Sequence, residues 1–551
     1  DAVIGGENDK EYREIILAMS ESKDPSTSTV DDNKPSTSTG SNAAMYQPEV
    51  VKPEWMELPP ELENVDFTQS IAWDKYQPYS DVPPVLTPLD TPPVFTSTGH
   101  QRALCFHLHA IDGRARAGTI HFKNSAPPVP TPRFMPVGTK GTLKGVFPED
   151  IPNMDCPMIL ANTYHLAIQP GTELIDTVFG GLPKFMGGEE VITTTSDNNS
   201  NEDNDNNDNN TNNGSNKRRR LFNLLTDSGG LQMVSLAALS VVTEEAVVFE
   251  SPYTKGQCMT LRPEDSIQCQ NEIGADVIMQ LDDVISSVQN DVHRFRLATL
   301  RTLRWYDRCV QAHMKPDTQN LYPILQGHLD TSPGGLREIC LAGFRHRDIV
   351  ITSEDGSDTP ARTIPGFAVG GLAGGESKED FWKVVDHACR HLPDNRPRYL
   401  MGVGYPLDLV ICTALGMDQY DCVYPTRTAR FGSAMVDEGG LLKLKQHEFA
   451  TQTDVVIMEG CPCCACSRKV SRARLHALLK AQNVLGVQLL TQHNVCYMMG
   501  LVQRMRNAIL EHRFQDFVHS FIKAHYCDKP QDIPQWVRDA LQAAGISLAN
   551  L

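Results

Sequence analysis

Short apolar runs that end in polar or glycine-rich clusters recur along most of this chain, and a longer amphipathic stretch follows each of them. Runs of this length are typical of buried strands, and the stretches between them have the period of a helix. In chain order the runs are FMPVG near 136, MILANTYHL near 160, FNLLTDSGG ending at Gly230, DVIMQLDD ending at Asp283, LYPILQG ending at Gly327, GFAVGGLAGGE around Gly371, RYLMGVG ending at Gly404 and YDCVYPTR around Asp421. Repeated strand–helix units predict an α/β fold with parallel strands.

Two parallel architectures fit this pattern, a doubly wound sheet and a (β/α)8 barrel of the TIM type. A doubly wound sheet collects its ligands at one switch point, whereas every strand of a barrel delivers its carboxyl end to the same mouth. Polar residues suited to chemistry follow many of the runs, so we expect the barrel.

The composition changes along the chain and predicts four regions. Residues 1–101 are acidic and rich in Ser, Thr and Pro, which predicts a disordered tail. The barrel is expected over residues 102–455, with an Asn/Asp-rich insertion at about 188–220 that cannot bury apolar surface and must loop out. A zinc-binding subdomain is expected over residues 456–510, and a C-terminal helical segment that packs on the barrel over residues 511–551.

The insertion ends in the basic run Lys217-Arg218-Arg219-Arg220. Such a run can act as a nuclear-import signal or as a phosphate-binding patch. A solvated flank of the insertion is the interpretation that we favour, because short charge runs are weak signals.

Bulk composition restricts the class of protein. No apolar run approaches the ~20 residues that a membrane-spanning helix needs. The 15 cysteines are an odd number in a long chain, which favours reduced thiols in a cytoplasmic protein over a disulfide framework. The net charge of −18 argues at first against a nucleic-acid partner, but much of the acid lies in the N-terminal tail and does not describe the core.

Acids and an amide stand at the ends of several predicted strands. They are Asp227, Asp282, Asp283, Gln326 and Asp421, with exposed backbone at Gly370-Gly371. The carboxyl ends of barrel strands converge, so one pocket would contain most of these groups. Two carboxylates in one pocket can divide into a nucleophile and an acid/base, as in glycosyl transfer. For Asp227, a helix N-cap is the alternative.

A cysteine cluster near the C-terminus predicts a metal site. Cys461, Cys463 and Cys466 are followed by His493, and three thiolates with one imidazole form the closed tetrahedral site of one structural Zn²⁺ ion. Cys464 is an additional candidate ligand, and a chance cluster of buried or redox thiols is the alternative. Because four protein ligands leave no position for water, we expect no catalytic role for this metal.

Taken together, these motifs resemble the tRNA-guanine transglycosylase family, and most closely the catalytic subunits of its eukaryotic members. The resemblance covers the chain from about residue 102 to the C-terminus. It rests on PVGTKGTLKG, NTYHL, FMGG, LLTDSGG, MQLDDV, ILQG, GFAVGGLAGGE, RYLMGVGYP, DCVYPTRTARFG and the cysteine cluster. It implies a pentosyltransferase that exchanges guanine at the wobble position of GUN-anticodon tRNAs for queuine.

The resemblance also implies the catalytic pair. Asp421 matches the nucleophile that attacks C1′ of the ribose and forms a covalent ribosyl-enzyme. Asp227 matches the general acid/base that handles protons as guanine leaves and the new base attacks.

Further positions match the binding of base and tRNA. Met401 matches a residue that packs on the face of the base, and the edge of the base would be read by Asp282, Gln326, Gly371 and Leu372. Arg427 and Arg430 match contacts to the uridines that flank the target in the anticodon loop, where splayed bases can be read.

The substrate preference is expected from two small residues. Gly374 and Val284 stand where the bacterial enzymes, which use a smaller base, usually carry valine and cysteine. A glycine leaves room for the cyclopentenediol group of queuine, so the resemblance implies queuine. Leu231 departs from the family because it replaces an aromatic residue that stacks on the base, and such stacking is worth about 1–3 kcal/mol.

The family resemblance implies a heterodimer with a related, non-catalytic accessory subunit. We expect a cytoplasmic location without direct membrane insertion. A peripheral location on the mitochondrial outer membrane is an alternative. A competing hypothesis is that this chain is the non-catalytic, tRNA-binding subunit, and the presence of both Asp421 and Asp227 argues against it. A metal-dependent hydrolase would need metal ligands at the strand ends, and the predicted mouth shows acids and an amide but no histidine cluster.

Overall fold

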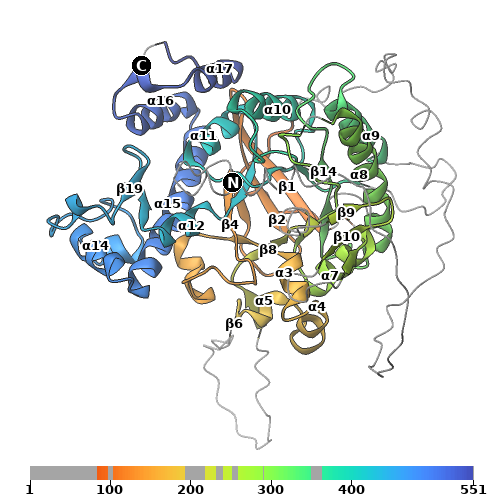
Figure 1. The fold of residues 1–551 in the computed structure, drawn as a ribbon, viewed down its shortest axis with the longest axis horizontal. Coiled ribbons are helices and arrows are strands. Elements are labelled where there is room, and N and C mark those ends of the chain that lie inside the picture. Colours follow the sequence, from red (N-terminus) through yellow and green to blue (C-terminus); the bar gives the residue numbers. More distant parts are fainter. Residues whose placement is uncertain are drawn as a thin grey trace, which may run out of the picture. The chain divides into compact units, whose positions relative to one another are not determined.

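Parallel strands form the centre of the fold, and each of the eight apolar runs of the sequence contains at least one (Figure 1). They are β4 (Arg133–Pro136), β5 (Met158–Ala161), β8 (Asn223–Thr226), β12 (Val277–Met279), β13 (Asn320–Tyr322), β14 (Ile324–Leu325), β15 (Phe367–Val369), β16 (Arg398–Leu400) and β17 (Gln419–Cys422). The computed structural model describes residues 84–96, 103–192, 217–230, 240–250, 258–289, 291–348 and 363–549. These residues belong to one compact unit, Ser70–Leu551.

The order of the parallel strands leads back to its starting point. One sheet has the order β13-β12-β8-β5, and another has the order β14-β15-β16-β17-β4. Only Pro323 separates β13 from β14, and a parallel bridge joins Val137, the residue after β4, to Leu160 of β5. The parallel α/β fold predicted from the sequence is confirmed, and this strand order is that of the TIM type.

Alternate residues of the strands belong to two different apolar clusters. In β5, Met158 and Leu160 belong to a cluster that draws on most of the ring strands, whereas Ile159 and Ala161 belong to a larger cluster shared with the helices. This alternation gives the strands an inner and an outer face. An antiparallel sheet of β1 (Leu104–Asp112), β2 (Ala115–Phe122) and β3 (Val129–Thr131) adds apolar side chains to the inner cluster.

Helices follow the strands, as the sequence predicts. They are α3 (Thr163–Ile168), α4 (Thr172–Leu174), α5 (Leu182–Phe185), α7 (Pro263–Ile273), α8 (Val292–Ala312), α9 (Leu336–Arg347), α10 (Lys378–His391), α11 (Pro406–Leu415) and α12 (Tyr424–Arg430). A short π-helix covers Ile175–Phe179, and a sheet of β9 (Ser240–Val242), β10 (Val247–Glu250) and β11 (Cys258–Leu261) precedes α7. Polar side chains cap several helix starts. At α10, for example, the Ser377 side chain accepts a hydrogen bond from the backbone amide of Asp380.

The C-terminal part of the chain, blue in Figure 1, is mostly helical. It contains β18 (Ser433–Met435), β19 (Leu441–Lys443), α13 (Cys464–Ser467), α14 (Arg472–Lys480), α15 (Val484–Leu510), α16 (Phe514–His525) and α17 (Gln535–Ala543). The long helix α15 contacts α12, β1, β4 and β18, and α17 contacts α10 and α11. Thus α15 connects the cysteine-rich region, through α13, with α12, the helix that follows Asp421 in the chain.

Two segments assigned to flexible regions by composition make defined contacts. In the predicted tail, the backbone amide of Thr87 donates to Leu108 O at 2.7 Å, and His109 Nδ1 donates to Thr87 O at 2.7 Å, so this part is attached to β1. The rest of the predicted tail up to residue 83 lies outside the described residues.

The predicted insertion at about 188–220 begins and ends in a hairpin of β6 (Glu189–Ile192) and β7 (Lys217–Arg220), while residues 193–216 lie outside the described residues. The two guanidinium nitrogens of Arg220 bind the Asp276 carboxylate at 2.7 and 2.8 Å. The interpretation of this basic run as a solvated flank is therefore wrong at Arg220.

Among the described helices, none combines the length and the apolar character that spanning a membrane requires.

Candidate active site

The polar residues predicted at strand ends lie at the carboxyl ends of the parallel strands. Asp227 follows β8, Gln326 follows β14, Met401 follows β16, and Asp421 is the third residue of β17. Asp282 lies three residues beyond the end of β12. The closed strand order brings these ends to the same mouth.

The Asp421 carboxylate is buried and held through one of its oxygens. Its Oδ1 accepts a hydrogen bond of 2.6 Å from the Tyr399 hydroxyl and one of 2.8 Å from the Gly402 backbone amide. Burial raises the pKa of Asp421, and these two donors oppose that shift because they favour the charged form. The second oxygen, Oδ2, has no hydrogen-bond partner among the described residues and is available to a ligand.

The Asp227 carboxylate is bound by the start of α3. Its Oδ2 accepts from Asn162 Nδ2 at 2.6 Å, and its Oδ1 accepts from the backbone amide of Thr163 at 3.0 Å. Burial, with a contribution from the charge of Asp421, raises the pKa of Asp227 to about 7. This group can therefore donate and accept a proton near neutral pH. A helix begins at Gly230, and its following residues lie outside the described ones, so the N-cap alternative for Asp227 stays untested.

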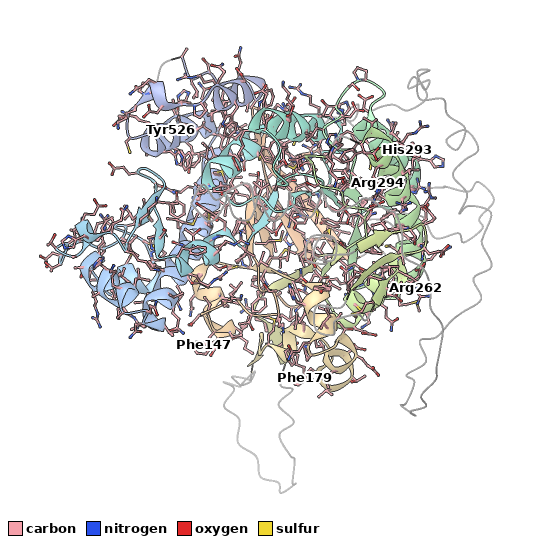
Figure 2. All side chains as sticks on the ribbon, in the orientation of Figure 1. Phe147, Phe179, Arg262, His293, Arg294 and Tyr526 are labelled. Carbon is pink, nitrogen blue, oxygen red and sulfur yellow. The ribbon has the colours of Figure 1, made fainter. Side chains whose placement is uncertain are left out.

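The neighbouring acids Asp282 and Asp283 have different surroundings. Two arginines of α8 bind the Asp283 carboxylate, Arg294 with bonds of 2.6 and 2.7 Å and Arg301 at 2.5 Å; Arg294 is labelled in Figure 2. Asp282 forms no such ion pair with the described residues, and it accepts from Gln326 Nε2 at 2.7 Å. Burial raises the pKa of Asp282 to about 7. Asp283 is thus a structural ion-pair partner, and Asp282 is the acid that stays available in the mouth.

Gln326 and the glycine turn after β15 share a buried arginine. The Arg337 guanidinium donates to Leu325 O at 3.0 Å and to Gly370 O at 2.9 Å. Gly371 has φ +70°, and a Cβ there would lie 2.5 Å from Gln326 Oε1. Glycine is therefore required at 371 both by its backbone conformation and by the close approach of Gln326.

The two residues expected to set substrate size lie on neighbouring loops. Val284 follows the acid pair, and Gly374 lies after the glycine turn. The Ser287 hydroxyl and the Gly374 backbone amide both donate to Glu376 Oε2, at 2.7 and 3.0 Å. A Cβ at Gly374 would lie 2.7 Å from Ser287 Oγ, so any side chain there must displace Ser287.

The remaining expected contacts have the following positions. Leu372 is partly buried against the outer cluster, and Met401 is partly buried against the inner one. Arg427 and Arg430 are exposed on α12, directly after Asp421, and form no ion pair with the described residues. Leu231 lies outside the described residues, so its stacking role is untested.

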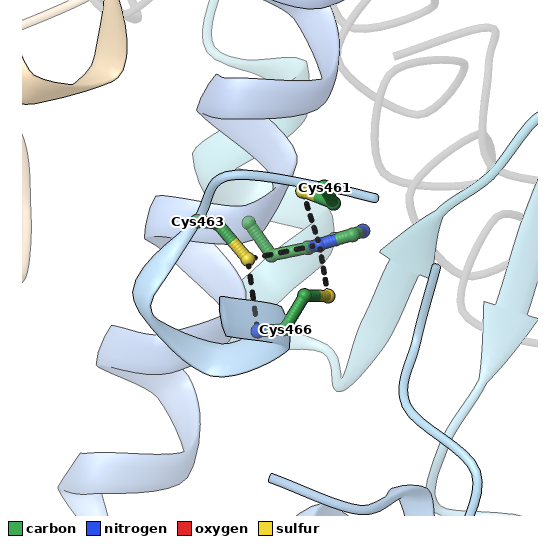
Figure 3. A group of neighbouring side chains, drawn as sticks. Cys461, Cys463 and Cys466 are labelled. Carbon is green, nitrogen blue, oxygen red and sulfur yellow. Dashed lines mark hydrogen bonds between the residues drawn. The ribbon is translucent and has the colours of Figure 1, made fainter. Parts of the chain in front are cut away.

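The four expected metal ligands come together, and Figure 3 shows the three cysteines among them. The sulfurs of Cys461, Cys463 and Cys466 lie 3.6, 3.4 and 3.5 Å from His493 Nδ1, and all four side chains are buried. His493 Nε2 donates to Met435 O at 2.9 Å, which orients the ring. Cys464 points elsewhere, to the side chain of Gln492, and is not part of the group. These separations fit a tetrahedral ion with bonds of roughly 2.0–2.3 Å.

Comparison with known proteins identifies the family. The family model described as "Queuine tRNA-ribosyltransferase" matches residues 112–220 and 204–527, which include every candidate site residue. The chain belongs to the queuine tRNA-ribosyltransferase family.

Curated relatives agree with this family over most of their length. The "Queuine tRNA-ribosyltransferase catalytic subunit" of Schizosaccharomyces pombe is 41% identical over 442 residues, which cover 79% of this chain and 95% of that protein. The protein of the same description from Caenorhabditis elegans is 40% identical, with 80% and 99% covered. The "Queuine tRNA-ribosyltransferase" of Thermus thermophilus is 38% identical, with 80% and 98% covered.

In this member of the queuine tRNA-ribosyltransferase family, several residues that hold the candidate catalytic acids were not expected from the sequence. Tyr399 binds Asp421, and Asn162 and Thr163 bind Asp227. Both motifs were visible, because Tyr399 lies in RYLMGVG and the other two in NTYHL. Successive side chains of a strand point to opposite faces, so this alternation could have predicted that Tyr399 points into the barrel, beside the Asp421 carboxylate.

Proposed function

We propose that this chain is the catalytic chain of a tRNA-guanine transglycosylase that exchanges guanine in tRNA for queuine. The observation that carries the proposal is the pair Asp421 and Asp227, two buried carboxylates close enough that the charge of one raises the pKa of the other. Burial raises the pKa of both acids, and the charge of Asp421 adds to the rise at Asp227, whose pKa reaches about 7.

In the first half-reaction, Asp421 Oδ2 attacks C1′ of the target ribose. The bond between C1′ and the guanine nitrogen breaks, and its electron pair goes to the base. Protonated Asp227 gives its proton to the departing guanine, so the ribose is left joined to Asp421 as an ester and the tRNA backbone stays intact. The bonds from Tyr399 and Gly402 leave Oδ2 free and orient it.

In the second half-reaction, the same two groups exchange their tasks. Ionised Asp227 takes a proton from the ring nitrogen of the incoming base, and that nitrogen attacks C1′. The ester bond breaks, and Asp421 regains its charge. A pKa of about 7 allows Asp227 to serve in both directions without a large cost.

The base is recognised by groups that are fixed before it arrives. Asp282 and Gln326 share a hydrogen bond, and the adjacent turn at Gly371 exposes backbone groups. Met401 and Leu372 supply apolar contacts, and Gly374 with Val284 leaves room for the larger substituent of queuine. Such a preorganised polar edge can discriminate bases by leaving its groups unpaired with the wrong one.

The anticodon loop binds next to the nucleophile. Arg427 and Arg430 are one helical turn apart on α12 and exposed, so both guanidinium groups can reach nucleotides on either side of the target. The target base must leave its stack to enter the mouth, as in other enzymes that act on a nucleobase.

One structural Zn²⁺ is assigned to Cys461, Cys463, Cys466 and His493, since their donor set and separations fit that ion. When bound, the ion cross-links the cysteine loop to α15. We also propose a cytoplasmic enzyme that works with a related accessory subunit, as the family resemblance implies.

The test is transfer of labelled guanine and of queuine into tRNA by the full chain, alone and with its accessory subunit. Asp421→Asn should abolish both exchanges and the covalent tRNA adduct on a denaturing gel, whereas Glu438→Gln, an exposed acid outside the mouth, should leave them unchanged. Normal exchange by Asp421→Asn would exclude the nucleophile assignment. No exchange by the unaltered chain under either condition would favour a non-catalytic tRNA-binding subunit.

A further inference from the structure

A second group of metal-ligating side chains lies between α9 and α10, away from the cysteine cluster. It consists of Glu338, in the first turn of α9, and of His387 and His391 near the end of α10. One ligand atom from each lies within 4.8 Å of the others. Because the histidines are four residues apart on one helix, both rings project from the same face.

The buried ring of His387 has no hydrogen-bond partner for either nitrogen among the described residues. Its side chain is only 9% exposed, and its Nε2 lies 3.6 Å from Glu338 Oε1. That separation is too long for a hydrogen bond, and an unsatisfied buried imidazole is costly. A separation of roughly 3.3 Å is what two ligands of one tetrahedral ion have when each bond is about 2.0 Å.

His391 and Glu338 are each oriented by a hydrogen bond that leaves one potential ligand atom without that bond. His391 Nδ1 donates to the backbone oxygen of His387 at 2.7 Å, which leaves the lone pair on Nε2. Such a bond to a carbonyl is the usual support of a metal-bound imidazole. Glu338 Oε2 accepts from the Gly334 backbone amide at 2.8 Å, so Oε1 is the oxygen that faces His387.

We propose that Glu338, His387 and His391 bind a second divalent transition-metal ion, with Zn²⁺ as the expected occupant. Two imidazoles and one carboxylate suit zinc and its first-row neighbours, whereas Mg²⁺ and Ca²⁺ require a shell of oxygens. Three protein ligands leave a fourth position to water or to a small ligand. The cysteine cluster differs, because its four ligands close the coordination shell.

This site would fix the helices that support the recognition of the base. Arg337, next to Glu338, binds Leu325 O and Gly370 O behind Gln326 and the glycine turn. An ion shared by α9 and α10 would therefore hold both helices in one relative position. The positive charge of Arg337 opposes a nearby cation, so we expect weaker binding here than at the cysteine cluster.

The alternative occupant of this space is a proton, in which case His387 and Glu338 form a simple ion pair. Equilibrium dialysis of the metal-free full chain against Zn²⁺, followed by metal analysis, separates the two. The proposal requires a second equivalent of zinc that His391→Asn removes. His346→Asn replaces an exposed histidine of the same helix as Glu338 and should keep both equivalents.

Cobalt provides a readout that distinguishes the two sites. Co²⁺ bound by thiolates gives sulfur-to-metal charge-transfer bands, and Co²⁺ bound by two imidazoles and a carboxylate gives only ligand-field bands. His391→Asn should remove the ligand-field component of the second equivalent and leave the thiolate bands intact, which also shows that the variant is folded. A single equivalent in the unaltered chain, or two equivalents in His391→Asn, would overturn the proposal. Neither result depends on the transglycosylase assay.

Discussion

The Tyr399 hydroxyl donates a hydrogen bond of 2.6 Å to Oδ1 of Asp421, and both residues come from neighbouring parallel strands. Tyr399 is fully buried within the inner apolar cluster, so its ring fills space while its hydroxyl reaches the mouth. Burial alone would favour the protonated form of Asp421, and this donor favours the anion that the proposed attack needs.

Tyr399→Phe should weaken the nucleophile without emptying the core. A hydrogen bond to a charged group is worth about 1.5–3 kcal/mol, so kcat for guanine exchange should fall by about 10- to 100-fold. The acidic limb of the pH–rate profile should move to higher pH, because the pKa of Asp421 rises further. Tyr420→Phe is the control, since that hydroxyl bonds Thr413 in the outer cluster at 2.8 Å. An unshifted acidic limb in Tyr399→Phe would contradict this role.

The raised pKa of Asp227 predicts how stability varies with pH. The folded pKa of about 7 exceeds the unfolded value of about 3.9, so the folded state binds more protons between these values and loses stability as pH rises through them. From pH 5 to pH 8 we expect this group to contribute a loss of about 2.6 kcal/mol, which Asp227→Asn should remove.

Urea unfolding of both proteins at the two pH values measures that difference. We compare how the free energy of unfolding changes with pH, because contacts that the substitution alters equally at every pH do not affect this slope. Asp437→Asn is the matched control: Asp437 is partly buried and its pKa is lowered despite that burial, chiefly by Arg504, so this substitution should keep the slope of the unaltered chain in this range. Equal slopes for Asp227→Asn and the unaltered chain would refute the assignment.

The sequence predicted the strands and the positions of the polar residues better than it predicted which groups those polar side chains bind. Strand ends could be read because each apolar run is short and bounded, and barrel closure then places Asp227 and Asp421 together. The sequence could not show which of the adjacent acids Asp282 and Asp283 forms ion pairs. Asp283 is paired with Arg294 and Arg301, which lie on a helix that follows it in the chain. Such pairings depend on packing and carry no periodic signal.

The arginine run at the insertion shows the opposite case. Composition predicts a solvated flank for it, yet a single residue, Arg220, reaches a nearly buried carboxylate at Asp276. The parallel pairing of β8, which follows Arg220, with β12, which follows Asp276, brings the two together. Local composition cannot anticipate such a contact.

Gly374→Val should exclude queuine while guanine exchange continues. Because a Cβ at this position meets Ser287 Oγ at 2.7 Å, the substitution is best made in a Ser287→Ala background, with Ser287→Ala alone as the control. We expect kcat/KM for queuine to fall by at least about 10-fold. Steady-state incorporation of each base would measure this, and unchanged queuine use would refute the size argument.

Asn494 should couple the cysteine cluster to α12, the helix that we propose binds tRNA. This fully buried side chain accepts from the Met435 amide at 2.9 Å and donates to Pro425 O at 3.0 Å, beside His493 and at the start of α12. Asn494→Ala leaves these groups unpaired, at a cost of about 1–3 kcal/mol each, and should loosen α12.

The expected results are a lower melting temperature and weaker tRNA binding, with zinc still bound at the cysteine cluster. Asn507→Ala, at an exposed position of the same helix, is the control. Asn494→Ala with tRNA affinity equal to that of the control would show that α12 is positioned without it.

Arg427 and Arg430 should act on tRNA binding through charge. Each exposed guanidinium that neutralises a phosphate contributes to the salt dependence of binding, with a slope of about 0.7 per contact for single strands. Arg427→Ala and Arg430→Ala should each weaken binding at low salt and reduce that slope by up to this amount. Arg513→Ala removes an exposed arginine paired with Glu511 and serves as the control for net charge. Titrations of tRNA at several salt concentrations measure the slope, and if both variants keep the slope of the control, then these arginines do not contact phosphates. A loss of affinity with an unchanged slope would instead indicate contacts to the bases that flank the target.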